Sequence, residues 1–417
     1  MLFTIYQVVM PMNKIGFGLV NLARHKTKEE QVVEPQFYDR FLLLMTLCLM
    51  CFGWIMVTSA SMPVAEKLYN NEYYISIKHA VFIAISLISM TVVFMFRMEW
   101  WRKYNMHLLL VAIVLLILVL LVGNTVNGSR RWLPLGIFNL QAAEVAKLFF
   151  FAFLAGYMVR QHEQLLENFK GFLKPLGVFT VLAVLLLQQP DLGTVIVMFV
   201  TTMALLFLAG ARIWQFIALI GSGLMAVVSL ILLEPYRLRR VTSFLDPWAD
   251  PFGSGYQLTQ SLMAYGRGDW AGLGLGNSIQ KLDYLPEAHT DFIAAVIAEE
   301  LGFVGLSILV VVLGVLVHRI LRIGSKAMEK EEHYNGYFAY AIGIWVAFQV
   351  FVNIGASTGL LPTKGLTLPF ISYGGSSLIL FSIAMAVVLR IDYELRQKED
   401  VELEVISEEG ADYEHIS

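Results

Sequence analysis

Apolar residues gather in ten runs along this chain, and polar segments separate the runs. Most runs are close to the ~20 residues that an α-helix needs to cross the hydrocarbon core of a bilayer. They cover 41–60, 77–96, 107–124, 141–159, 175–189, 192–210, 213–234, 291–317, 336–356 and 377–391. Because only helices and closed barrels satisfy the backbone within lipid, the pattern predicts an all-α, polytopic membrane protein with about ten transmembrane helices.

The same pattern divides the chain into three regions. Residues 1–40 form an N-terminal extension, 41–391 form the ten-helix membrane domain, and 392–417 form an acidic tail. The tail after Lys398 has no periodic apolar face, so we expect it to be disordered. The extension is not a secretory signal, because Lys14 interrupts its apolar start and a charged stretch follows.

The distribution of Lys and Arg predicts the orientation. With the N-terminus in the cytoplasm, 19 of the 30 Lys and Arg residues lie in cytoplasmic segments, 10 lie in or beside the opposite loops, and Lys147 lies inside a span. Cytoplasmic loops carry an excess of positive charge, so both termini are expected in the cytoplasm. The irregular polar segments 124–140, 235–290 and 357–376 then lie together on the other side, which indicates that the chemistry takes place there.

Composition narrows the choice further. Of the 417 residues, 57% are hydrophobic and only 15% are charged, as in a membrane bundle. The net charge of −3 gives no indication of a nucleic-acid partner. Cys48 and Cys51 lie inside the first apolar run, where small buried side chains are a commoner outcome than a redox or metal pair.

The segment from Asp283 to Gly302 runs from polar residues directly into an apolar helical pattern. Its polar part holds four ionisable groups: Asp283, Glu287, His289 and Asp291. Pro286 disfavours helix before this point, and Thr290 or Asp291 is placed to cap the helix that follows. The carboxylate of Asp291 is therefore expected where a membrane helix meets water, partly desolvated, which suits a catalytic base.

Glu299 and Glu300 are not expected to act as a pair with Asp291. Along one helix they lie about 12–13.5 Å further on, beyond the roughly 5–9.5 Å that separates the two carboxylates of glycoside hydrolases. The segment therefore offers one base. A single base suits a reaction whose leaving group needs no proton, such as a pyrophosphate stabilised by cations.

Glu144 and Lys147 are three residues apart near the outer end of the fourth span. The favoured interpretation is a local ion pair within the bundle, and the alternative is that the two side chains line a substrate cavity.

Arginine residues cluster on the predicted outer side, against the general trend of positive charge. They are Arg130, Arg131, Arg237, Arg239 and Arg240. Guanidinium groups bind phosphates in a bidentate manner, and contact with anionic lipid headgroups explains each single Arg equally well.

The last span opens with Ser-Tyr-Gly-Gly-Ser-Ser at residues 372–377. Free N–H groups at a helix N-terminus, approached closely through glycine, form an anion site, which makes Ser376 and Ser377 candidate contacts. A turn that merely starts the helix is the alternative. Lys364 adds a positive charge to the same loop. The Gly-Leu-Gly-Leu-Gly segment at 272–276 has no preceding strand, so we interpret it as a flexible loop and not as a nucleotide motif.

Several of these segments resemble the SEDS family of cell-wall polymerases, and the resemblance covers nearly all the spans. The most specific are Tyr284-Leu-Pro-Glu-Ala-His-Thr-Asp-Phe292, Glu299-Glu-Leu-Gly302 and Pro362-Thr-Lys-Gly-Leu-Thr-Leu-Pro-Phe-Ile-Ser-Tyr-Gly-Gly-Ser-Ser377. The Thr-Lys-Gly sequence around Lys364 and the N-terminal extension resemble the cell-division members more than the elongation members, in which that position is usually apolar.

The resemblance implies a peptidoglycan glycosyltransferase that polymerises lipid II at the outer face of the bacterial cytoplasmic membrane, at the division septum. It also implies a class B penicillin-binding transpeptidase and other division proteins as partners. It assigns the catalytic role to Asp291. It allows a divalent cation, Mg or Mn, although no spacing in the sequence indicates a metal-ligand set.

Both lines of reasoning lead to one hypothesis, in which Asp291 accepts the proton of an acceptor sugar hydroxyl and undecaprenyl pyrophosphate leaves. The candidate substrate contacts are Lys364, Arg237, Arg240, Ser376, Ser377, Glu144, Lys147 and His289. A lipid II flippase whose path is lined by buried charges, and a non-enzymatic division scaffold, are the alternatives.

Overall fold

The computed structural model describes residues 38–126, 129–134, 139–167, 169–211, 213–233, 244–362 and 365–414. The predicted N-terminal extension lies almost entirely outside these residues. Three candidate substrate contacts, Arg237, Arg240 and Lys364, also lie outside them.

Each of the ten predicted spans coincides with a helix. These helices are α2 (Arg40–Tyr69), α3 (Tyr74–Phe94), α4 (Met98–Val122), α5 (Ala142–Arg160), α7 (Phe169–Gln188), α8 (Leu192–Leu208), α9 (Ile213–Leu232), α12 (Ile293–Glu329), α13 (His333–Ser357) and α14 (Gly375–Glu414). Within the described part of the chain, seven helices are long and apolar enough to cross a membrane, while the apolar α8 is shorter at 17 residues. The prediction of an all-α, polytopic membrane protein is confirmed.

Local chemistry explains where these helices begin and end. Asp39 caps α2 by accepting a hydrogen bond from the Leu42 backbone N–H at 3.0 Å. Asn70 ends the same helix in the left-handed conformation. Asp191 caps α8 through the backbone N–H of Thr194 at 3.1 Å. Only residues 189–191 separate α7 from α8, so the fifth and sixth predicted spans form a tight helical hairpin.

Helix α12 is broken, which the sequence pattern did not predict. Gly302 has φ 69° and ψ −172°, so the element consists of a short helix over 293–301 and a longer one over 303–329. Gly302 is also pressed against another segment, because a Cβ built on it would lie 2.4 Å from the backbone nitrogen of Gly272. Only glycine accommodates both the positive φ and this close approach.

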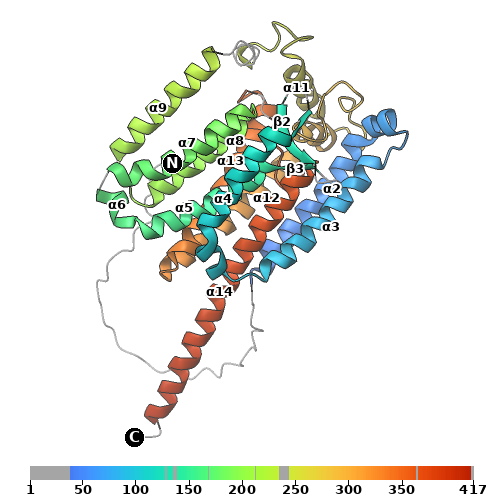
Figure 1. Cartoon of the computed structure of the whole chain (residues 1–417). Coiled ribbons are helices and arrows are strands. Elements are labelled where there is room, and N and C mark those ends of the chain that lie inside the picture. The colour runs from blue at the N-terminus through green and yellow to red at the C-terminus, as the bar shows by residue number, and fades with distance from the viewer. Residues whose placement is uncertain are drawn as a thin grey trace, which may run out of the picture. The chain divides into compact units, whose positions relative to one another are not determined.

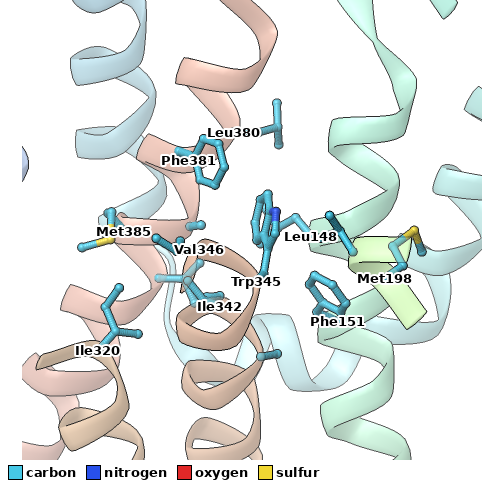
Figure 2. Close-up of a cluster of buried hydrophobic side chains, with 14 of the residues drawn as sticks. Leu148, Phe151, Met198, Ile320, Ile342, Trp345, Val346, Leu380, Phe381 and Met385 are labelled. Atoms are coloured by element: carbon cyan, nitrogen blue, oxygen red, sulfur yellow. The ribbon is translucent and has the colours of Figure 1, made fainter. Parts of the chain in front are cut away.

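The centre of the bundle is a cluster of large apolar side chains around Trp345 of α13. Figure 2 shows Trp345 between Phe381 of α14 and Phe151 of α5. The Trp345 and Phe381 rings are stacked with centroids 4.8 Å apart, and Phe151 lies 5.9 Å from Trp345. Helix α5 is buried along nearly its whole length, whereas α3 and α4 expose apolar side chains of the kind that face lipid.

A small antiparallel sheet replaces the irregular segment expected over 124–140. Its strands are β1 (Asn124–Val126), β2 (Ser129–Pro134) and β3 (Asn139–Gln141), in the order β1-β2-β3. Strands of three residues are too short for an alternating pattern to predict. The sheet and the short helix α11 (Tyr256–Gly268) lie at one end of the helices, and α14 projects from the other end (Figure 1).

The C-terminal tail differs from the prediction of disorder. Helix α14 continues through the acidic sequence to Glu414, as the long red helix in Figure 1 shows. Glu and Leu are strong helix formers, and the tail extends a helix that is already nucleated inside the bundle. The absence of an apolar face therefore did not imply the absence of a helix.

A second short helix, α6 (His162–Glu167), connects α5 to α7.

Candidate active site

Two loops at the end of the bundle that carries the small sheet are hydrogen-bonded to the same side chain of α13. The Nδ2 atom of Asn353 donates to the backbone carbonyl of Asp291 at 3.0 Å and to that of Leu366 at 2.6 Å. Asn353 is 2% exposed, so these bonds form in a region of low dielectric where they are costly to break. Asn353 thereby fixes the segment that carries the predicted base against the loop that follows Lys364.

Asp291 lies half-buried at the entrance to α12. The helix begins at Ile293, its N-cap residue is Phe292, and no side chain caps it. The predicted cap by Thr290 or Asp291 is therefore wrong, because the Thr290 hydroxyl instead contacts Glu287 Oε2 at 2.7 Å. The carboxylate of Asp291 points toward the opposite loop, since a Cβ built on Gly365 would lie 3.3 Å from its Oδ2 atom.

The loop that contains the three glycines forms backbone hydrogen bonds to α12 at the break. The backbone N–H groups of Leu273 and Gly274 donate to the carbonyls of Glu299 and Glu300 at 3.0 and 2.9 Å. On the other side of the break, the Phe303 N–H donates to the Asp269 carbonyl at 2.8 Å. These bonds satisfy the backbone groups that a helix end leaves without partners.

The glycine segment predicted to be a flexible loop is thus held in a defined set of turns. Gly272, Gly274 and Gly276 all have positive φ angles, of 78°, 92° and 84°. Such angles favour glycine, which explains the Gly-Leu-Gly-Leu-Gly sequence without a nucleotide.

Glu299 and Glu300 fix the same loop with their side chains. Both are completely buried. Glu299 accepts hydrogen bonds from the Ser278 hydroxyl and from the backbone N–H groups of Ile279 and Gln280. These contacts give Glu299 a structural role, and the expectation that neither glutamate forms a catalytic pair with Asp291 stays a prediction.

Glu300 belongs to a buried ion pair that joins three segments. Its Oε1 atom lies 2.8 Å from Lys281 Nζ and accepts from the Ser59 hydroxyl of α2 at 2.7 Å. Lys281 Nζ also donates to the Gly276 carbonyl at 2.7 Å. The network therefore ties α2, the glycine segment and the first half of α12 together just behind the candidate base.

The Glu144–Lys147 ion pair is present, as the favoured interpretation predicted. Lys147 Nζ lies 2.8 Å from Glu144 Oε1, and both side chains are buried. Lys147 also donates to Gln349 Oε1 at 3.0 Å and lies 4.8 Å from the centre of the Trp345 ring. A lysine with an anion, an amide and an aromatic face has its charge well compensated inside the membrane.

Gln349 connects this ion pair to the start of α14. Its Nε2 atom donates to the Thr367 carbonyl at 3.0 Å, and the Thr367 hydroxyl lies 2.7 Å from that of Ser377. The neighbouring Ser376 hydroxyl donates to the Asn139 carbonyl of β3 at 2.8 Å. The hydroxyl groups of both serines therefore join α14 to its neighbours, and their role toward an anion stays a prediction.

His289 lies against Tyr373 at the same place. The Tyr373 N–H donates to the His289 carbonyl at 2.9 Å, and the two ring centroids are 5.6 Å apart. Burial lowers the pKa of His289 from its ordinary value, and the charge of Glu287 opposes that shift. The Nδ1 atom of the ring has no hydrogen-bond partner among the described residues.

A cavity of about 500 Å³ opens beside His289. It lies between the end of α2, the start of α3 and the loop before Asp291, and its polar lining residues are Lys67, Tyr69, Tyr74, Lys78, Asp283, Glu287, His289 and Tyr373. Lys67 pairs with Asp283 at 2.6 Å, and Lys78 lies 4.4 Å from the centre of the Tyr74 ring. Two lysines at a polar mouth suit a phosphate-bearing ligand.

The Arg residues of the outer face divide into two groups. Arg131 donates to the backbone carbonyls of Gln189 and Pro190, so it holds the hairpin between α7 and α8. The carbonyl contacts give Arg131 a structural role. Arg237 and Arg240 lie outside the described residues, so their predicted contact with phosphate stays a prediction.

The described residues contain no group of three His, Cys, Asp or Glu side chains that could hold a metal ion. We therefore assign no step of a reaction at this site to a metal ion.

Sequence reasoning missed the polar residues that build this site. Gln349, Asn353 and Ser357 follow one another at four-residue spacing on α13, each hydrogen-bonded to another segment of the chain. Polar residues repeating every fourth position in an apolar span place one polar face toward the bundle, and that signal was available. His79 of α3 is also buried, with its ring centroid 5.8 Å from that of Tyr373.

Similar proteins share both sequence and fold with this chain. The family model for FtsW, RodA and SpoVE, described as "Cell cycle protein", matches residues 39–397. A probable peptidoglycan glycosyltransferase FtsW of Alteromonas naphthalenivorans is 62% identical over 375 residues, which cover 90% of this chain and 72% of that protein. Its counterpart from Escherichia coli O6:H1 is 55% identical over 379 residues, 91% of each chain.

Two solved structures have the same architecture. One is a chain from a study of the structural coordination of polymerization and crosslinking by a peptidoglycan synthase complex, with a TM-score of 0.72 and 26% identity over 86% of this chain and 98% of that one. The other is the rod shape determining protein RodA of Thermus thermophilus, with a TM-score of 0.64 and 26% identity over 85% of this chain and 96% of that one.

Proposed function

The chain belongs to the FtsW/RodA/SpoVE family of cell cycle proteins, and from this premise we propose that it is a peptidoglycan glycosyltransferase. In this proposal it polymerises lipid II at the outer face of the cytoplasmic membrane for septal wall synthesis. The observation that carries the proposal is the position of Asp291, a half-buried carboxylate at a membrane helix entrance that points toward the loop at Gly365.

The reaction needs one base and a cationic site for the leaving group. The Asp291 carboxylate accepts the proton of the 4-hydroxyl of the acceptor sugar, and the oxygen forms a bond to the anomeric carbon of the donor. The bond from that carbon to the pyrophosphate oxygen breaks, and undecaprenyl pyrophosphate leaves with the electron pair. The leaving group is already anionic, so no second carboxylate is needed to protonate it.

Lys364 is the proposed first contact of the pyrophosphate, because it precedes Gly365, where a Cβ would lie 3.3 Å from Asp291 Oδ2. Arg237 and Arg240 are proposed to assist it. Asn353 positions the reaction by holding the backbone of both loops, and the cavity beside His289 is proposed to receive the polar part of a lipid-linked sugar.

A partner is proposed on the same reasoning. One similar structure belongs to a peptidoglycan synthase complex that both polymerises and crosslinks. We therefore propose that this chain works with a class B penicillin-binding transpeptidase and with other division proteins at the septum. The excess of Lys and Arg in the predicted cytoplasmic segments supports placing the active site on the other side of the membrane.

Polymer formation from labelled lipid II by the purified protein tests the proposal. Asp291→Asn keeps the size of the side chain but removes the base, so the rate should fall by about 10²–10⁴-fold while the protein remains folded. Asp291→Glu should recover little, since misplacement of about 1 Å can cost ~10²-fold. The matched control is Asp250→Asn, which changes an exposed carboxylate bonded to Ser254 and should leave the rate unchanged.

The alternatives predict other outcomes. A flippase would move lipid II across vesicle membranes without joining it, and a scaffold would do neither. Substantial polymerisation by Asp291→Asn would remove Asp291 as the base.

A further inference from the structure

A second cavity, of about 370 Å³, lies at the end of the bundle opposite the candidate active site. Its lining residues are Glu99, Arg102, Lys103, Gly156, Val159, Arg160 and Tyr334. They come from the start of α4, the end of α5 and the start of α13. The same end carries the C-terminal part of α14, which Lys398 joins to Glu332 just before α13. The proposed glycan synthesis uses none of these residues.

The charge around this cavity is predominantly positive. Arg102 and Lys103 are exposed and form no ion pair within the described part of the chain. Arg160 Nη1 donates to the neutral Asn105 side chain at 3.2 Å, which leaves its charge uncompensated. Glu99 is the one carboxylate in the lining set, and it lies 3.3 Å from Arg97 outside the cavity. Three cations against one partly neutralised anion favour an anionic ligand.

Tyr334 gives a second, independent indication of a ligand. The side chain is only 3% exposed, lines the cavity, and its hydroxyl has no hydrogen-bond partner among the described residues. A buried hydroxyl without a partner is unfavourable. A ligand oxygen in the cavity would accept its hydrogen bond.

The surroundings of the cavity are those of a membrane surface. Phe96, Trp100 and Tyr104 form a chain of rings with centroids 5.4 and 5.3 Å apart, as in the aromatic belts at the level of lipid headgroups. Further along α4, Met106 and Leu110 are 54% and 60% exposed, which provides an apolar path leading from the cavity toward the bilayer centre. A soluble ion would gain nothing from contact with these apolar side chains, whereas an acyl chain would.

We propose that this cavity binds the phosphate group of an anionic phospholipid in the cytoplasmic leaflet. Arg102, Lys103 and Arg160 bind the phosphate, the Tyr334 hydroxyl donates to one of its oxygens, and the acyl chains lie along the exposed face of α4. Basic sites between membrane helices on the cytoplasmic side commonly take such headgroups. Free phosphate shares the polar chemistry but lacks the chains.

Native mass spectrometry of the full-length protein in detergent, titrated with phosphatidylglycerol, tests the proposal. Each Lys or Arg near a membrane surface contributes a factor of about five to lipid affinity, so Arg102→Gln with Lys103→Gln should weaken binding about 25-fold. Tyr334→Phe should weaken it by about 2- to 10-fold. The matched control is Lys174→Gln, an exposed cation near the start of α7 that lies outside the cavity, and its affinity should equal that of the wild type.

Two comparisons distinguish the source of the phosphate. Phosphatidylcholine should bind more weakly than phosphatidylglycerol, and inorganic phosphate at millimolar concentration should not displace the lipid. Equal affinity of the wild type and the double variant would overturn the proposal, as would displacement by inorganic phosphate, which would assign the site to a soluble anion. Because Arg102 and Lys103 are exposed and Tyr334→Phe retains the ring, all variants should stay monodisperse.

Discussion

Asp291 and the pair formed by Glu299 and Glu300 lie within ten residues of one another, yet their surroundings are opposite. Glu299 and Glu300 are completely buried, and the loop over 276–281 supplies them with hydroxyl, amide and ammonium donors. Asp291 is half-buried and lies where the helix opens toward the other loop. Carboxylates thus stabilise the fold at Glu299 and Glu300, whereas the carboxylate of Asp291 is accessible for a reaction.

The difference shows what burial does to a carboxylate in a membrane protein. A fully buried carboxylate stays charged only when hydrogen-bond donors or cations contact it. When those partners lie on other segments, the carboxylate links the segments together. A carboxylate that exchanges protons with a substrate must reach both the substrate and a polar environment. In this chain the deeper acids are structural, and the shallower acid is the candidate base.

The break at Gly302 directly follows the two buried glutamates and is where the glycine segment bonds to α12, so removing it should have the largest effect. Gly302→Ala places a Cβ at φ 69° and within 2.5 Å of the Trp270 carbonyl oxygen. The variant must move the glycine segment or lose the break, and we expect it to accumulate poorly in the membrane. Fluorescence-detected size exclusion measures this, with Gly314→Ala as a control, since a Cβ at Gly314 meets no atom within 4 Å. Normal accumulation of Gly302→Ala would show that the break is dispensable.

Glu300→Gln should destabilise the fold nearly as strongly. It leaves the ammonium group of Lys281 buried without its anion, and removing one partner of a buried pair costs about 3–5 kcal/mol. Thermal unfolding in detergent should show this loss, whereas Asp291→Asn should unfold like the wild type. If both substitutions lowered stability equally, the distinction between structural and catalytic acids would fail.

The fold was largely predictable because its signal is carried by long apolar runs. All ten runs became helices. The break at Gly302 could not be predicted from the same signal, because the apolar pattern continues on both sides of it. Its cause is a close approach by Gly272, thirty residues earlier, and such a contact leaves no trace in local periodicity.

The candidate site was predicted less completely. Asp291 and the ion pair at Lys147 were identified because charged residues are rare in apolar spans and therefore conspicuous. Asn353 and His79 were overlooked because neutral polar residues are less conspicuous in apolar spans than charged ones. The partners of Glu299 and Glu300 could not be predicted, because Lys281, which pairs with Glu300, lies in a loop that only the folded chain brings to α12.

The Glu144–Lys147 pair should show a smaller effect, because Lys147 keeps Gln349 and the Trp345 ring when Glu144 is removed. Lys147→Met should be the more damaging single change, since it leaves a buried carboxylate whose Oε2 atom already has no hydrogen-bond partner among the described residues. Glu144→Gln combined with Lys147→Met should be more stable than Lys147→Met alone. Contacting pairs typically couple by about 0.5–3 kcal/mol. A thermal-unfolding cycle without coupling would contradict the contact.

The smallest expected effect on stability concerns Lys67 and Asp283 at the mouth of the cavity beside His289. Their side chains are 67% and 46% exposed, so the ion pair contributes about 0–1 kcal/mol. Lys67→Gln and Asp283→Asn should therefore both unfold like the wild type.

The kinetics of the two variants should differ if the cavity receives a phosphate. Loss of the cation should raise the lipid II concentration at half-maximal rate about fivefold, the effect of ~1 kcal/mol between charges 4 Å apart in water, and high salt should diminish the difference. Asp283→Asn removes the same ion pair but frees the ammonium group for the substrate, so it should leave that concentration unchanged or lower it. An equal loss of rate in both variants would mean that the pair only supports the loop.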